Sequence, residues 1–302
     1  MFVWMYYDSF RQYLNSRGLF YLHFPVTTIA FLFAVLASYV FNSLLHMKAV
    51  GVALAMLTQM LACLVSIVII ALCFKVSREK LKPLSRASCR RTCSIARRGF
   101  PAFLMYFLDL ISLEVMIIVS SFISTEHLAA NTALVQLFYA VVVFGFGVQG
   151  SAGPLVGQAI GAGDVEKAKS LVRAAWVVGM AFIVLICSVY VPLAETISSI
   201  YTTDEQVLGI MAKSAPFVAM SLVLATSLLS LGSVVIGLGK QVLAGLVNPV
   251  IYLLIGIPLG LLLVFLGEMY EGGFWVGLSA AYLCINMFFY TLYKRTDYKR
   301  IV

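Results

Sequence analysis

Two acidic residues, Asp109 and Glu114, lie in the middle of a long apolar stretch that runs from residue 100 to residue 123. A charged side chain at the centre of a lipid bilayer costs several kcal/mol, so such residues are rare there. Where they occur, they usually face a water-filled cavity or the interior of a helical bundle, and they bind protons, cations or substrate. We therefore take this pair as the candidate functional site.

The composition predicts a membrane protein. Of the 302 residues, 62% are hydrophobic and 11% are charged, and the mean hydropathy is +1.00, a balance that soluble domains of this length do not show. Eight apolar stretches are long enough to cross a hydrocarbon core of about 30 Å as helices. They are residues 19–45, 49–74, 100–123, 128–157, 171–193, 209–236, 242–267 and 273–293. The sequence therefore predicts an all-α polytopic membrane protein with about eight transmembrane helices, surrounded by the lipid bilayer.

The distribution of basic residues predicts the orientation, because loops rich in Lys and Arg stay on the cytoplasmic side. All of the 21 Lys and Arg residues except Lys48 and Lys213 fall on one side of the eight spans. Both chain ends are therefore expected on the cytoplasmic side. The membrane is expected to be the plasma membrane or that of an organelle. The net charge of +8 is explained by this sidedness, so no nucleic-acid partner is expected.

One polar segment divides the spans into two groups. It is cationic and contains Pro83 and several serines between two apolar blocks, which is typical of a linker. The predicted organisation is the end of an amino-terminal lobe with two spans at 1–74, a basic cytoplasmic linker at 75–99, a carboxy-terminal lobe of six helices at 100–293, and a cytoplasmic tail at 294–302.

A glycine-rich motif at the end of the fourth span is the most specific pattern in the chain. Residues 155–164 read Leu-Val-Gly-Gln-Ala-Ile-Gly-Ala-Gly-Asp, and Gly161 and Gly163 could supply a left-handed exit from a helix. Gly-Leu-Gly-Lys-Gln at 237–241 and Gly-Phe-Trp-Val-Gly-Leu at 273–278 support it. Together these patterns resemble the multidrug and toxic compound extrusion (MATE) family of carriers.

The resemblance implies an amino-terminally incomplete, twelve-helix, two-lobe fold, of which this chain matches roughly the last two thirds. It also implies a secondary active antiporter that exports organic, cationic compounds in exchange for H⁺ or Na⁺, without another cofactor. Family members commonly place two carboxylates five residues apart in their seventh helix, and Asp109 and Glu114 match that spacing, with Asp in place of the first Glu. Glu114 is the deeper of the two and is the first candidate for the coupling site.

Four other polar residues inside the spans are candidate linings of an ion or substrate cavity. They are Asn131, Gln136, Asn248 and Tyr252. Each of them alone is more often explained by hydrogen bonds between helices, which hold transmembrane bundles together, than by contact with a substrate. Aromatic side chains near an acid would suit organic cations through cation–π attraction.

Two enzymatic interpretations are weak. Gly161, Gly163 and Asp164 match a Gly-x-Gly-Asp protease pattern, but Asp164 precedes a charged, aqueous loop rather than a buried site. The segment 232–240 lacks the residue order of a phosphate-binding loop. The three His and six Cys residues show no metal-ligand spacing. We expect neither an enzyme nor a metal site.

Two other functions remain open. The chain could be a truncated, non-transporting form, or one that needs a dimer or a partner to supply further helices. It could also move a lipid-linked glycan, as other exporters of the same superfamily do. The spans contain no cluster of Arg to hold a phosphate, which disfavours the glycan.

Overall fold

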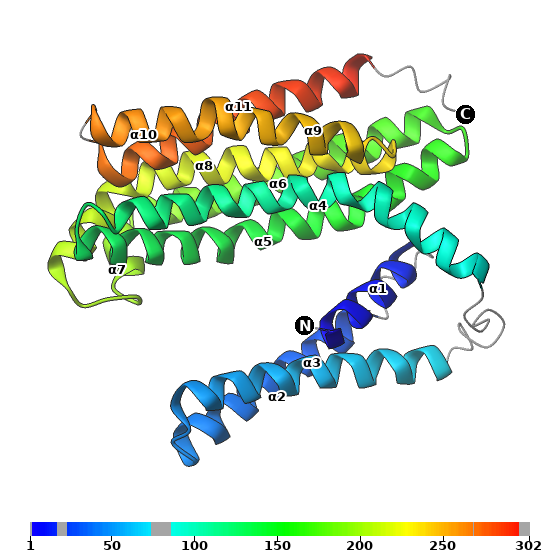
Figure 1. The fold of residues 1–302 in the computed structure, drawn as a ribbon, viewed down its shortest axis with the longest axis horizontal. Helices are drawn as coiled ribbons and strands as arrows, with labels where there is room; N and C mark the ends of the chain where they lie inside the picture. Colours follow the sequence, from blue (N-terminus) through cyan, green and yellow to red (C-terminus); the bar gives the residue numbers. More distant parts are fainter. Residues whose placement is uncertain (1, 17–22, 74–85, 268, 296–302) are drawn as a thin grey trace. The chain divides into compact units, whose positions relative to one another are not determined.

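The computed structural model describes residues 2–16, 23–73, 86–267 and 269–295. Every regular element within these ranges is a helix (Figure 1). The chain divides into two compact units, Met1–Cys89 and Arg90–Val302, and each is described by itself below. The domain boundaries expected from the sequence stay predictions.

The first unit is a small helical bundle. Its elements are α1 (Phe2–Ser16), α2 (His23–Tyr39), the π-helical turn η2 (Val40–Leu44) and α3 (Lys48–Cys73). Helix α3 packs against both α1 and α2. Tyr7, Val26, Ala30 and Cys63 are buried where these three helices meet. The two spans expected at 19–45 and 49–74 thus form an antiparallel hairpin.

The second unit is a larger bundle arranged around one central helix. Its elements are α4 (Arg86–Ser120, which begins just before the unit boundary), α5 (Thr125–Gly161), α6 (Val165–Tyr190), α7 (Ala194–Ser198), α8 (Glu205–Gly237), α9 (Gln241–Ile251), the π-helical turn η3 (Tyr252–Gly256), α10 (Ile257–Phe265) and α11 (Tyr270–Arg295). Helix α8 packs against α5, α6 and α11, and most residues of its apolar part are buried. It forms the core of the unit.

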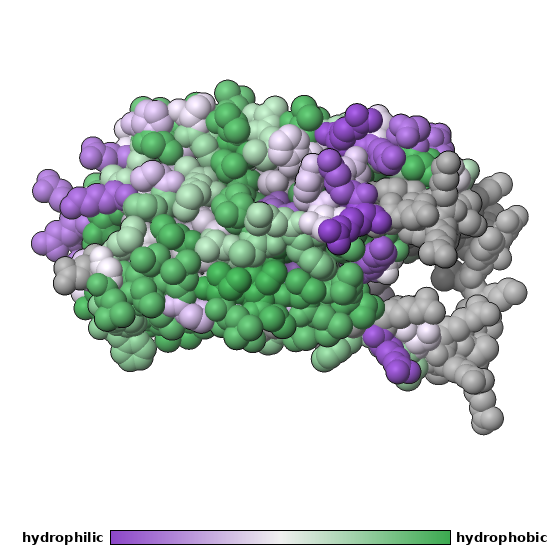
Figure 2. Space-filling view, turned by 90° about the horizontal axis from the view of Figure 1, so that it is seen from above, coloured by the Kyte–Doolittle hydropathy of each residue, from purple (hydrophilic) through white to green (hydrophobic). Residues whose placement is uncertain are grey.

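Among the described residues, seven helices are long and apolar enough to cross a membrane. They cover Pro25–Leu44, Lys48–Ser66, Thr125–Gly161, Val165–Tyr190, Glu205–Gly237, Gln241–Phe265 and Tyr270–Arg295. The remaining predicted span, 100–123, lies on α4, where the described residues contain a shorter apolar helix, Leu110–Ser120. Figure 2 shows hydrophobic side chains across the middle of the face that carries α10 and α11, with hydrophilic ones toward both ends. The polytopic, all-α fold is confirmed.

The predicted linker is partly helical. Residues 86–99 belong to α4, because the stretch from Arg86 to Arg98 contains neither Gly nor Pro and is rich in residues that tolerate a helix. Residues 75–85 of the predicted linker lie outside the described residues, as do residues 296–302 of the predicted tail.

The glycine-rich motif ends helix α5. Gly163 adopts a left-handed conformation with φ of 75°. Its N–H donates to the Ile160 carbonyl, and the Asp164 N–H donates to the Ala159 carbonyl, which is the hydrogen-bond pattern of a Schellman motif. Gly161 is the last residue of the helix and does not supply the exit. The expectation was therefore right for Gly163 and wrong for Gly161.

Helix α11 approaches a broken span very closely. Pro258 lies in the first turn of α10 and cannot donate a backbone hydrogen bond, and the preceding turn η3 separates α10 from α9. A Cβ atom on Gly277 would lie 2.5 Å from the Gly256 oxygen and 2.5 Å from the Gly260 nitrogen. Small residues at such a crossing let transmembrane helices pack backbone to backbone.

We expect Gly277→Ala to destabilise the protein by about 1–3 kcal/mol, the usual cost of overpacking, because the new methyl group meets rigid backbone atoms. Gly150→Ala on α5 is the matched control, since nothing lies within 4 Å of its Cβ position and Ala is the better helix former. Thermal unfolding of the detergent-purified variants measures the difference. Equal melting temperatures for the two variants would contradict the proposed crossing.

Candidate functional site

The acid pair lies on helix α4. Glu114 belongs to the apolar segment Leu110–Ser120, and its side chain is exposed on the surface of the second unit. Within the described part of the chain, its carboxylate has no hydrogen bond or ion pair. Asp109 is on the same helix, but its side chain lies outside the described residues. An exposed carboxylate on an apolar helix needs water, a cation or a proton to offset its charge.

Aromatic side chains line a cavity beside the same helix. The cavity has a volume of about 140 Å³ and lies between α4, α5, α8 and α11. Leu113, the neighbour of Glu114, forms part of its wall together with Phe138, Tyr139 and Tyr282. The Phe138 and Tyr282 rings are stacked at 6.5 Å between centroids. The candidate carboxylate is thus one residue away in sequence from an aromatic, mostly apolar chamber.

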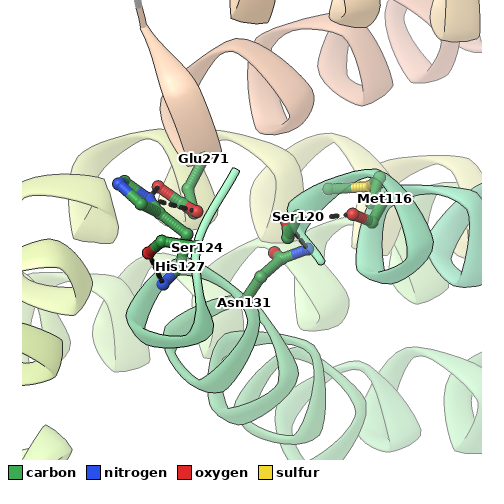
Figure 3. A network of polar contacts seen from close by, with 6 residues as sticks. All are labelled: Met116, Ser120, Ser124, His127, Asn131 and Glu271. Carbon is green, nitrogen blue, oxygen red and sulfur yellow. Dashed lines mark hydrogen bonds and ion pairs between the residues drawn. The ribbon is translucent and has the colours of Figure 1, made fainter. Parts of the chain in front are cut away.

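The two polar candidates on α5 have different surroundings. Asn131 is fully buried, and its Nδ2 donates to the Ser120 hydroxyl at 3.1 Å. Ser120 in turn donates to the Met116 carbonyl at 3.0 Å (Figure 3). Asn131 therefore joins α5 to the end of α4. Gln136, in contrast, is exposed and is the one of the two that is open to a ligand.

The remaining two candidates lie on the broken span. Asn248 and Tyr252 are 5% and 2% exposed. The Tyr252 ring contacts Tyr282 edge to face at 6.1 Å, and it lines a cavity of about 20 Å³ together with Ser112 and Met116 of α4. This is about the space that one water molecule needs. Tyr252 thus lies against α4, the helix that carries Glu114, but on a different face of α4 from Glu114.

The sequence did not predict a buried carboxylate at one end of the bundle. Glu271 lies just outside the predicted span 273–293, yet it is only 2% exposed. Both of its carboxylate oxygens lie 2.7 Å from Nδ1 of His127, whose ring also packs on Tyr270 with 4.8 Å between centroids. Figure 3 shows the two side chains meeting beside the Ser124 cap of α5. The pair was missed because 144 residues separate its members.

This pair ties the start of α5 to the start of α11. A buried carboxylate that loses its partner destabilises the folded protein, because no interaction then offsets the cost of removing the charge from water. We call the pair of Glu271 and His127 the clamp. It lies at the same end of the bundle as Ser120 and Asn131, and we assign it a structural role separate from that of Glu114.

We expect Glu271→Gln to lower the stability of the protein by about 1–3 kcal/mol, since it replaces a charge-assisted hydrogen bond by a neutral one. The control is Glu195→Gln in the first turn of α7, where the residue is exposed and the change should be close to neutral. Thermal unfolding in detergent is the measurement. A melting temperature for Glu271→Gln that equals the wild-type value would show that the clamp does not contribute to stability.

Comparisons with known proteins identify the family. The MatE family model matches residues 101–262, which is more than half of the chain. Multidrug and toxin extrusion protein 1 of Mus musculus is 26% identical over 289 residues, a match that covers 96% of this chain and 51% of that protein. The resemblance drawn from the glycine-rich motifs is therefore confirmed.

Solved structures share the fold. The eukaryotic MATE transporter AtDTX14 matches with a TM-score of 0.86 at 18% identity, over 95% of this chain and 65% of that chain. A mutant of the Vibrio cholerae MATE transporter VcmN matches with a TM-score of 0.80 at 20% identity, over 98% and 67%. This chain spans about half the length of the curated relatives it matches. It belongs to the MATE family, whose members are transporters rather than enzymes.

Proposed function

We propose that this chain forms the ion- and substrate-binding part of a secondary active antiporter that exports organic, cationic compounds in exchange for H⁺ or Na⁺. The observation that carries the proposal is the Glu114 carboxylate, exposed on an apolar helix of a MATE chain and without a partner among the described residues. Such a group is costly to keep in a membrane protein unless it binds a cation or a proton.

Exchange of the substrate for the coupling ion follows because both would neutralise the same carboxylate. A proton, a sodium ion or a cationic substrate can each neutralise Glu114, and two of them cannot do so at the same time. Binding of the coupling ion therefore weakens binding of the substrate and promotes its release. Asp109 is assigned as the second carboxylate of the site from its spacing on α4.

The substrate class rests on the aromatic cavity beside Leu113. Phe138, Tyr139 and Tyr282 line this cavity, and the faces of aromatic rings attract organic cations through the ring quadrupole. The Mus musculus relative is named for the extrusion of drugs and toxins. We assign Gln136, which is exposed on α5, as a further substrate contact, and Asn131, Asn248 and Tyr252 as buried groups that shape the site.

The site can be tested by removing one charge. We expect Glu114→Gln to reduce ion-driven transport of a cationic dye to the level of protein-free liposomes, because the amide can neither carry a proton nor neutralise a cation. Dye movement in proteoliposomes is measured under an imposed proton gradient and, separately, under a sodium gradient. Glu126→Gln serves as the control of equal charge change.

Wild-type activity with one gradient and not the other identifies the coupling ion. Full, gradient-dependent transport by Glu114→Gln would refute the assignment of the coupling site. Loss of transport in Glu126→Gln as well would point to a general effect of charge rather than to this carboxylate.

A second candidate is a form that transports only with helices supplied by another chain, or not at all. It is favoured by the observation that the curated relatives are about twice as long. An antibody against residues 294–302 measures the mass of the native protein in membranes. A band at 33.1 kDa, together with wild-type proteoliposomes that are inactive, would support this candidate. A band heavier by the mass of several spans would contradict it.

A further inference from the structure

A wide groove runs between helices α6, α8 and α11. It has a volume of about 520 Å³, far larger than the cavity beside Leu113, and it opens on the surface of the second unit. We call it the α6–α11 groove, and the side chains that matter for the argument are Arg173, Trp176, Leu231, Met287 and Tyr290. None of these residues belongs to the site on α4.

The groove lies toward the basic end of the bundle. Helix α6 begins at Val165, while α8 ends at Gly237 and α11 ends at Arg295, and all three of these ends lie at the same end of the unit (Figure 1). This is the end that the basic loops predict to be cytoplasmic. Membrane leaflets on that side are rich in anionic lipids.

One cation in the groove has no counter-ion. Arg173 makes no ion pair within the part of the chain that the structure describes, whereas the acidic residue nearest to it on α6, Glu166, lies 3.7 Å from Lys169. A second cation is close by, since Nζ of Lys294 lies 5.3 Å from the centre of the Tyr290 ring. A guanidinium group binds the oxygens of a phosphate with two parallel hydrogen bonds.

The rest of the groove is mostly apolar. The indole N–H of Trp176 donates to the Ser227 hydroxyl at 3.0 Å, which holds the ring in place as one wall. Leu231 forms the buried floor, and Met287 and Tyr290 remain 65% and 50% exposed. Trp and Tyr side chains are favoured at the level of lipid headgroups, where one edge is apolar and the other is wet.

We propose that the α6–α11 groove is a binding site for one anionic phospholipid of the cytoplasmic leaflet. Its phosphate binds Arg173, with Lys294 adding positive charge, and one acyl chain lies along Trp176, Leu231 and Met287. The charge complementarity selects this occupant, because Arg173 attracts an anionic headgroup and repels the cationic compounds proposed as substrates. The site is therefore separate from the transport pathway.

Native mass spectrometry of the purified chain tests the proposal without any transport measurement. The protein in neutral detergent is mixed with equal amounts of phosphatidylglycerol and phosphatidylcholine, and the fraction carrying one lipid of each kind is measured. We expect phosphatidylglycerol to be preferred, and Arg173→Gln to reduce that preference by about fivefold. Lys167→Gln on the same helix, an exposed residue outside the groove, should leave the preference unchanged.

A second readout separates the groove from the general charge of the surface. Trp176→Ala removes one wall but no charge, and we expect it to weaken binding of both lipids to the same extent. Arg173→Gln should weaken binding of phosphatidylglycerol more than that of phosphatidylcholine, because the choline cation already offsets the phosphate charge of the second lipid. Equal binding of the two lipids by the wild type would overturn the proposal. So would an equal loss of preference in Arg173→Gln and Lys167→Gln, which would mean that only the overall charge attracts the lipid.

Discussion

The second unit depends on the close approach of α11 to its neighbours. In hydrocarbon, helices gain little from the hydrophobic effect, so van der Waals packing and hydrogen bonds between helices must hold them together. Gly277 lets α11 meet the backbone of the broken span at Gly256 and Gly260. On its other side, the Ser221 hydroxyl of α8 lies 2.7 Å from the Ser279 hydroxyl. With α11 held in this way, α8 is enclosed on several sides and becomes the core.

The two ends of this bundle are held by different chemistry. At one end, the buried Glu271 pairs with His127 and joins α5 to α11, while Asn131 joins α5 to α4 through Ser120. At the other end, backbone hydrogen bonds close the α5 exit at Gly163, and the Asp164 side chain accepts a hydrogen bond from the Lys167 N–H at the start of α6. One end therefore holds the buried, paired Glu271, while the other carries Arg173, which has no ion pair among the described residues. This difference between the two ends underlies the proposed binding of an anionic lipid.

The polar groups of the bundle thus serve three separate purposes. The proposed transport site has an uncompensated carboxylate, Glu114, near an aromatic cavity. The proposed lipid site has an uncompensated cation, Arg173, above an apolar groove. A third group, Asn131 and Glu271, is buried and hydrogen-bonded, and these residues fix how the helices pack. Exposed and unpaired charges mark binding surfaces, whereas buried and paired ones mark structure.

The sequence by itself determined the fold class, the approximate limits of seven of the eight predicted spans, and the family, because apolar length and glycine spacing are local properties of the chain. It also located Glu114 on an apolar helix. Only the tertiary structure decided which polar residues are open to a ligand. Gln136 and Asn131 look alike in the sequence, yet one is exposed and the other is buried against Ser120. The sequence likewise could not predict the burial of Glu271 or the α6–α11 groove. Each depends on residues that are far apart along the chain and meet only when the helices pack.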